Sequence, residues 1–110
     1  MVWQKSIILV EKIYECSKAF PKTEKFGLTI QMRNAAISVP SNIAEGWGRQ
    51  SRKNYLQFLR VSRGSLYELE TQMLIAKKLN YYIDNKELEN LMTEISKMLN
   101  SLIRKLESKN

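Results

Sequence analysis

The stretch Ser38-Val39-Pro40-Ser41-Asn42-Ile43-Ala44-Glu45-Gly46-Trp47-Gly48-Arg49 decides the fold of this chain. It joins a proline inside a helical pattern, two closely spaced glycines and the start of a region without acidic residues. A proline in a helix interior removes a hydrogen bond and clashes with the preceding turn, so we expect the helix to kink at Pro40 rather than restart with Ser38 as its cap. Glycine favours the left-handed conformation that ends helices, so we expect the helix to end at Gly46 and Gly48.

Apolar residues on both sides of this stretch recur every three or four positions, as they do in amphipathic helices. The spacing predicts helices over about residues 3–20, 24–46, 51–79 and 84–106, with Thr23, Ser51 and Asp84 as their N-caps where a cap is visible. The first helix is expected to bury Trp3, Ile7, Val10, Tyr14, Ser17 and Phe20. Short connections make neighbouring helices antiparallel, which predicts an all-α, up-down-up-down four-helix bundle forming a single domain over residues 1–110.

Composition argues against catalysis and against a membrane span. The chain has no histidine and one cysteine, so the usual di-iron sites of bundles, arginine–histidine ribonuclease sites and cysteine zinc sites cannot form within it. Cys16 is expected to be a buried thiol. The longest apolar run, residues 7–10, is far shorter than the roughly 20 residues that cross a bilayer, and residues 1–3 carry no leader signal. We expect a cytoplasmic protein that is not an enzyme and holds no metal or cofactor.

Antiparallel packing allows contacts to be predicted from residue numbers. With a turn centred near residue 50, facing residues of the second and third helices should have numbers that sum to about 100. Ala36 then faces Gly64, and the missing side chain of Gly64 predicts a tight helix crossing there. The same sum places Arg33 beside Glu68, which predicts a structural ion pair between them.

The positive charge is concentrated in one segment. The formal charge is +2 for residues 1–48, +5 for residues 49–63 and zero for residues 64–110. On the third helix Arg52, Lys53, Arg60 and Arg63 share one arc, and Arg49 joins this basic arc if the helical phase extends that far back. Leu56, Tyr67 and Leu74 lie among them and exceed what one core-facing stripe requires.

The basic arc has three interpretations. It can be a solvated helix face, a surface for nucleic-acid phosphates, or a surface for an acidic protein partner. The absence of acidic residues over 49–63 weakens the first, because solvated helices normally mix charges. Trp47 can stack on a nucleobase, although capping the end of the bundle core is the favoured role for it.

The sequence also resembles a known family in several motifs. They are Trp3-Gln4-Lys5, Phe20-Pro21, Glu24-Lys25-Phe26-Gly27-Leu28, Gln31 to Ala36, Ser38 to Gly46, Phe58-Leu59 and Gly64 to Gln72. In these motifs the chain resembles the bacterial four-helix bundle protein family, which includes the proteins encoded by intervening sequences in 23S rRNA genes. The resemblance implies a ring-like homopentamer without established enzymatic activity. A similar protein, the accessory protein of diversity-generating retroelements, engages nucleic acid and a reverse transcriptase.

Taken with this resemblance, Leu56, Tyr67 and Leu74 are candidates for a subunit interface. Our leading hypothesis is a non-catalytic, oligomeric protein that binds RNA or DNA through the basic arc. The alternative hypothesis is a protein-interaction scaffold that uses the same arc to hold an acidic protein.

Overall fold

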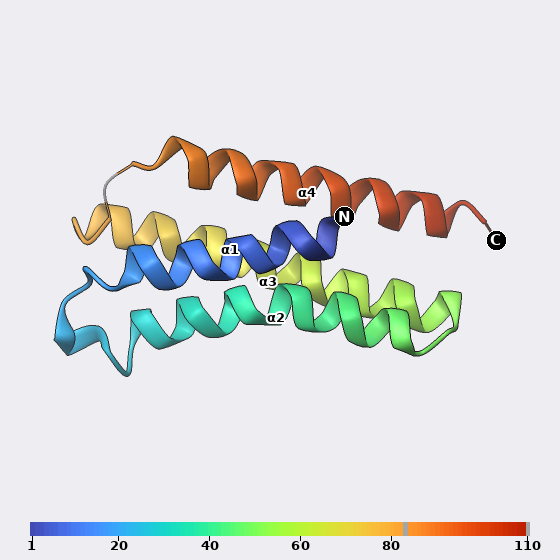
Figure 1. The fold of residues 1–110 in the computed structure, drawn as a ribbon, viewed down its shortest axis with the longest axis horizontal. Helices are drawn as coiled ribbons and strands as arrows, with labels where there is room; N and C mark the ends of the chain where they lie inside the picture. The colour runs from blue at the N-terminus through green and yellow to red at the C-terminus, as the bar shows by residue number, and fades with distance from the viewer. Residues whose placement is uncertain (83, 110) are drawn as a thin grey trace.

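Residues 1–82 and 84–109 are described by a computed structural model and form four α-helices and one 3-10 helix, with no β-strand among them (Figure 1). The elements are α1 Val2–Ser17, the 3-10 helix Lys22–Glu24, α2 Leu28–Gly48, α3 Arg52–Lys78 and α4 Lys86–Glu107. The predicted all-α class is confirmed. Ile83, in the connection predicted near residues 80–84, and Asn110 lie outside the described residues.

The helices pack side by side in chain order. Each helix contacts the next helix in the chain, and α4 also contacts α1 to close the bundle. The resulting body measures 47 × 25 × 20 Å. In α4 the buried residues recur every three or four positions, and they are Leu88, Met92, Ile95, Leu99 and Ile103. The core therefore runs along the bundle axis, with fully buried leucine and isoleucine side chains from α1, α3 and α4.

The contact between α2 and α3 is the most extensive in the bundle, and small residues lie within it. The Ser38 and Ser65 hydroxyls lie 2.8 Å apart, and the buried Ser62 hydroxyl donates to the Val39 carbonyl at 2.9 Å. Near the turn, a Cβ on Gly46 would lie 2.6 Å from Cβ of Phe58. Gly46 is therefore the residue whose missing side chain the packing requires.

The tight crossing predicted at Gly64 is not found. Gly64 is exposed, and a Cβ added there would meet nothing within 4 Å. The facing pairs are Ser38 with Ser65, Val39 with Ser62 and Gly46 with Phe58, so their numbers sum to between 101 and 104 rather than 100. Each residue of displacement turns a helix by about 100°, which is enough to carry Gly64 out of the contact.

Polar residues, and not glycines in the left-handed conformation, mark the ends of these helices. Ser51 caps α3 as predicted, because its hydroxyl accepts from the Asn54 amide at 3.3 Å. The cap of α4 is Asn85 rather than the predicted Asp84, and its Oδ1 accepts from the Leu88 amide at 3.1 Å. The left-handed residues are Gln50 and Asn80, whereas no glycine in the described chain has a positive φ.

The predicted start of the second helix is also wrong. Thr23 lies in the 3-10 helix, and α2 begins only at Leu28, where the Leu28 amide donates to Oε1 of Glu24 at 3.1 Å. From there α2 continues through Pro40 as one helix, so Ser38 does not start a new one. The Asn42 amide group donates to the Ser38 carbonyl at 2.8 Å and links the turns on either side of the proline. A kink at Pro40 stays a prediction.

The two glycines give a matched test of the α2–α3 contact. Gly46→Ala should lower the free energy of unfolding by about 1–3 kcal/mol, because the new Cβ would overlap Phe58. Gly64→Ala should raise it by up to about 1 kcal/mol, because alanine is the better helix former and its Cβ has open space. Urea unfolding followed by circular dichroism measures both. Equal midpoints for the two variants would contradict the assigned contact.

Candidate nucleic-acid interface

The five arginines and lysines of the predicted arc do not form one open surface. Arg49, Arg52, Lys53 and Arg60 are exposed, whereas Arg63 is half-buried. Arg63 donates to Oδ1 of Asn100 on α4 at 3.0 Å, so its guanidinium links α3 to α4. The arc therefore turns toward α4 along its length, and its freely accessible part lies near the α2–α3 turn.

Two other arc residues already have acidic partners. Arg60 forms a 2.6 Å ion pair with Glu107 of α4. Arg49 lies 3.4 Å from the Glu45 carboxylate, one helical turn earlier, and its guanidinium is 5.2 Å from the centre of the Phe58 ring. Both pairs are exposed, and exposed ion pairs contribute little and exchange readily. These contacts leave Arg49 and Arg60 accessible to a stronger anionic partner.

The C-terminal turns of α4 add cations that the sequence analysis did not assign to this surface. Arg104 and Lys105 lie in the last turn of α4, and Lys105 and Lys109 line the same cavity as Arg52. Residues 64–110 are neutral in total but carry −3 over residues 64–96 and +3 over residues 97–109. The net charge of residues 64–110 is zero because these two opposite charges cancel, whereas the formal charge of the end of α4 alone shows the excess of cations.

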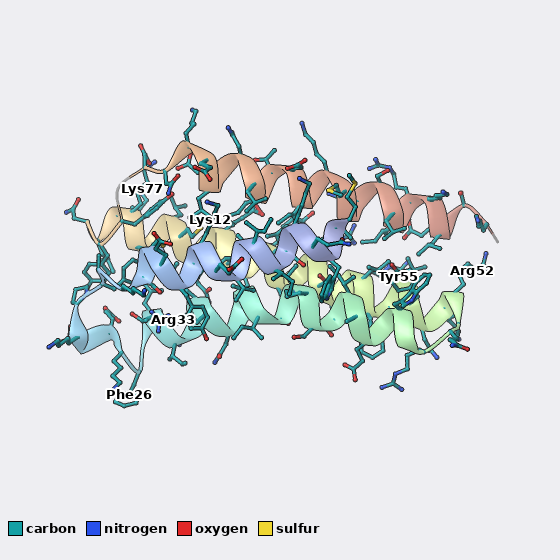
Figure 2. All side chains as sticks on the ribbon, in the orientation of Figure 1. Lys12, Phe26, Arg33, Arg52, Tyr55 and Lys77 are labelled. Carbon is teal, nitrogen blue, oxygen red and sulfur yellow. The ribbon has the colours of Figure 1, made fainter. Side chains whose placement is uncertain are left out.

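We call the resulting surface the basic end of the bundle. It consists of Arg49, Arg52, Lys53, Arg60, Arg104, Lys105 and Lys109. Residues 45–60 and 104–109 together contain these seven cations and two acids, Glu45 and Glu107, which gives +5 of the chain's formal +7. Figure 1 shows the α2–α3 turn and the end of α4 at the same end of the bundle, and Figure 2 shows Arg52 and Tyr55 there.

A cavity of about 650 Å³, which we call the end cavity, opens into the basic end. Its apolar lining includes Trp47, Tyr55, Leu102 and Leu106, which come from α2, α3 and α4. The described part of α1, Val2–Ser17, does not reach this end of the bundle, so the cavity walls come from α2, α3 and α4 (Figure 1).

Trp47 does not cap the core, contrary to the favoured expectation. Its side chain is 72% exposed at the mouth of the end cavity. It contacts the Tyr55 ring edge to face, with 5.6 Å between the ring centroids. Burial raises the pKa of Tyr55, so this phenol stays protonated and neutral at physiological pH. The exposed indole is available to another aromatic group.

The predicted buried face of the first helix is confirmed only in part, because Ser17 and Phe20 are buried and Val10 packs half-buried against the core. The residues of α1 that the bundle buries are Ser6, Leu9, Ile13 and Ser17. Trp3, Ile7 and Tyr14 are between 37% and 44% exposed. Trp3, Ile7 and Val10 line an apolar groove with Ile37, Pro40 and Ala44 of α2, which we call the α1–α2 groove. A stripe that the bundle leaves open is available to a partner surface.

Of the three predicted interface residues on α3, one packs against the core and two are exposed. Leu56 is half-buried and packs against the core, so the bundle itself uses much of its surface. Tyr67 is 47% exposed and Leu74 is 53% exposed. The molecule therefore presents apolar side chains on two different surfaces, one on α3 and one on the α1–α2 groove.

Arg33 does not pair with Glu68, so that prediction is wrong. Its Nε donates to the buried Ser17 hydroxyl at 2.8 Å, its Nη2 donates to the Tyr14 carbonyl at 3.3 Å, and the guanidinium lies 4.5 Å from the centre of the Tyr14 ring. Glu68 is exposed and forms no ion pair with a described residue. Arg33 reaches toward α1 instead of α3 and ties α2 to the end of α1.

The described residues contain no group of three or more histidine, cysteine or acidic side chains placed to hold a metal ion. Cys16 is half-buried, and burial raises the pKa of its thiol, which disfavours the reactive thiolate. In the part of the chain that the structure describes, no helix has the length and apolar character needed to cross a membrane. The basic end and the two exposed apolar surfaces are therefore the features available for a functional assignment.

These features define a small, basic, all-α bundle protein. The chain belongs to the 23S rRNA-intervening sequence protein family, whose family model matches residues 1–101. It is similar to the crystal structure of a protein of unknown function from the S23 ribosomal protein family of Bacteroides thetaiotaomicron. That similarity has a TM-score of 0.82 and 27% sequence identity, and it covers 94% of this chain and 95% of the other. No curated protein matches the chain.

The contacts of Arg33 predict different effects for the two residues once expected to pair. Arg33→Ala should lower the free energy of unfolding by about 1–2 kcal/mol, because the buried Ser17 hydroxyl loses one of its two partners and Tyr14 loses the stacked cation. Glu68→Ala should change it by less than about 0.5 kcal/mol, as exposed substitutions usually do. Thermal unfolding of both variants measures the difference. A larger loss of stability for Glu68→Ala than for Arg33→Ala would support the ion pair between Arg33 and Glu68 instead.

Proposed function

We propose that this protein is a non-catalytic homo-oligomer that binds RNA or another nucleic acid through its basic end. The observation that carries the proposal is the meeting of two cationic segments, residues 49–60 and residues 104–109, at one end of the bundle. A compact cationic surface is the electrostatic feature that phosphate binding needs, because each cation that meets a phosphate releases condensed counterions.

Several cations at this end remain uncommitted within the fold. Lys53, Lys105 and Lys109 form no ion pair with any acidic side chain of the described chain. The two acids at this end are already engaged, Glu45 by Arg49 and Glu107 by Arg60. Phosphates would therefore meet lysines without competition from neighbouring carboxylates, which favours binding over a purely solvating role.

The comparisons support RNA as the class of nucleic acid. The family is named for intervening sequences in 23S rRNA, and the similar solved structure is assigned to a ribosomal protein family. Neither name assigns RNA binding to this chain. Together with the basic end, they make structured RNA the first ligand to test.

We propose further that the chain is an antiparallel up-down-up-down bundle that assembles as a ring-like homopentamer in the cytoplasm. The facing pairs support the antiparallel arrangement, since Ser38 contacts Ser65 whereas Gly46, later in α2, contacts Phe58, earlier in α3. The α1–α2 groove and the apolar residues of α3 are different surfaces. Contact between unlike surfaces on successive subunits generates a ring when the rotation closes. A ring would repeat the basic end and add weak phosphate contacts through effective concentration.

One observation favours the alternative, a scaffold that holds an acidic protein. The exposed Trp47 and the apolar walls of the end cavity suit an amphipathic acidic segment as well as a nucleic acid. Treating a pull-down with nuclease separates the two functions. A scaffold would keep its partner after nuclease treatment, whereas a nucleic-acid-binding protein would lose the RNA that co-purifies with it.

Charge reversal at the basic end should weaken RNA binding. Lys53→Glu with Lys105→Glu should lower the affinity for structured RNA at least about tenfold at 0.1 M salt, because both cations are exposed and unpaired within the described chain. The control is Lys78→Glu with Lys86→Glu, which makes the same charge change at the opposite end of the bundle. Fluorescence anisotropy across a salt series measures both. An RNA affinity that does not change with salt concentration, or an equal loss of affinity in the control variant, would overturn the proposed interface.

Neighbouring isoleucines of α1 provide a test of assembly. Ile7 lines the α1–α2 groove and Ile8 does not, although the two are similarly exposed at 38% and 43%. Ile7→Lys should dissociate the oligomer, because it places a charge in the proposed interface, while Ile8→Lys should leave the oligomer intact. Native mass spectrometry of the unmodified chain should give five times the chain mass. A monomeric parent protein, or dissociation by Ile8→Lys alone, would exclude this interface.

A further inference from the structure

The end cavity joins an aromatic wall to a cationic rim, and this combination calls for a more specific ligand than phosphate alone. We propose that the end cavity binds one unpaired nucleotide of an RNA strand, with its base against Trp47 and its phosphate on the rim cations. This inference rests on the proposed nucleic-acid function and specifies what the basic end recognises.

The aromatic wall is suited to a nucleobase. Trp47 is 72% exposed and meets Tyr55 edge to face, so a face of the indole remains open to a third ring. Stacking of a base on an aromatic side chain contributes about 1–3 kcal/mol per base and tolerates any base, because every base has a π face. Leu102 and Leu106 from α4 line the cavity opposite the turn and exclude water from the stacked base.

The rim is suited to the phosphate. Arg52, Lys105 and Lys109 all line the cavity, and none of its lining residues is acidic. Glu107, the acid nearest in sequence to the lining residues of α4, is held by Arg60 at 2.6 Å. The Gln50 side chain, also in the lining, carries an amide donor and acceptor that can meet the edge of a base.

The shape of the site favours an unpaired nucleotide over a duplex. A volume of about 650 Å³ lies within the range of roughly 300–1,000 Å³ typical of small-ligand pockets. A base that is paired and stacked inside a helix cannot enter a concave site, whereas bases in loops, bulges and ends can splay out and stack on aromatic side chains. Charge alone would hold either form of RNA, so the cavity adds a preference for exposed bases.

The experiment uses Trp47 as its own probe. In a Trp3→Phe background Trp47 is the only tryptophan of the chain. Titration with a single-stranded adenosine oligonucleotide should quench its fluorescence in a saturable manner, and a duplex of equal length should bind with little quenching. Trp47→Ala should lower the single-strand affinity at least about tenfold. Phe26→Ala, which removes an aromatic side chain that is 87% exposed at the opposite end of the bundle (Figure 2), should leave this affinity within about twofold.

The remaining outcomes separate this inference from the proposed function. If RNA binding is salt-dependent and lost in Lys53→Glu with Lys105→Glu, yet Trp47→Ala binds single strands normally, the basic end stands and the nucleotide site is excluded. If neither RNA form binds, both proposals fail. Saturable quenching by decanoate or by an acidic peptide at lower concentration than the oligonucleotide would assign the cavity to another anion and overturn the inference.

Discussion

The close contact between α2 and α3 is the constraint on which the rest of the molecule depends. Gly46 has no room for a side chain against Phe58, and Ser38, Ser62 and Ser65 form hydrogen bonds across the same contact. Small residues of this kind lower the distance between two helix backbones and fix their register at the same time. Because the register is fixed, the first turn of α3 places Tyr55 beside the end of α2, where its ring meets Trp47. The aromatic wall of the end cavity is thus a consequence of this packing.

Much of the architecture could be predicted from the sequence, because helix periodicity and capping are local. Ser51 caps α3 as expected, and the strictly spaced apolar residues of α4 left one choice of buried face. Register between helices could not be predicted as well. An error of one to four residues in the facing pairs assigned the close contact to Gly64 instead of Gly46. The Arg33 prediction failed for another reason, because Arg33 turns toward Ser17 and Tyr14 of α1 and not toward α3. Because a helix turns by about 100° per residue, small errors along the chain become large errors around the axis.

The prediction of the buried face of α1 was partly wrong for a different reason. The helix has apolar residues on two adjacent faces, and the face with the larger side chains, including Trp3 and Tyr14, is the one left outside. The bundle buries Ser6, Leu9 and Ile13 instead, together with Ser17 of the predicted stripe. Ser6 and Ser17 donate to carbonyls three residues earlier, which satisfies their hydroxyls within the helix. Side-chain size therefore does not decide which of two apolar faces a helix buries.

The sequence predicted only part of the candidate site, and the remaining residues could be assigned to it only from the fold. Arg52 and Lys53 follow the turn directly, but Lys105 and Lys109 lie more than 50 positions later and reach the same end only because α4 packs against α3. The cations at this end line a cavity and not a flat surface. Charge attracts any polyanion, whereas a hollow with an exposed indole selects among polyanions by what can enter it. The coincidence of both features at one end, produced by helix lengths and register together, is the physical reason to expect recognition there in addition to non-specific attraction.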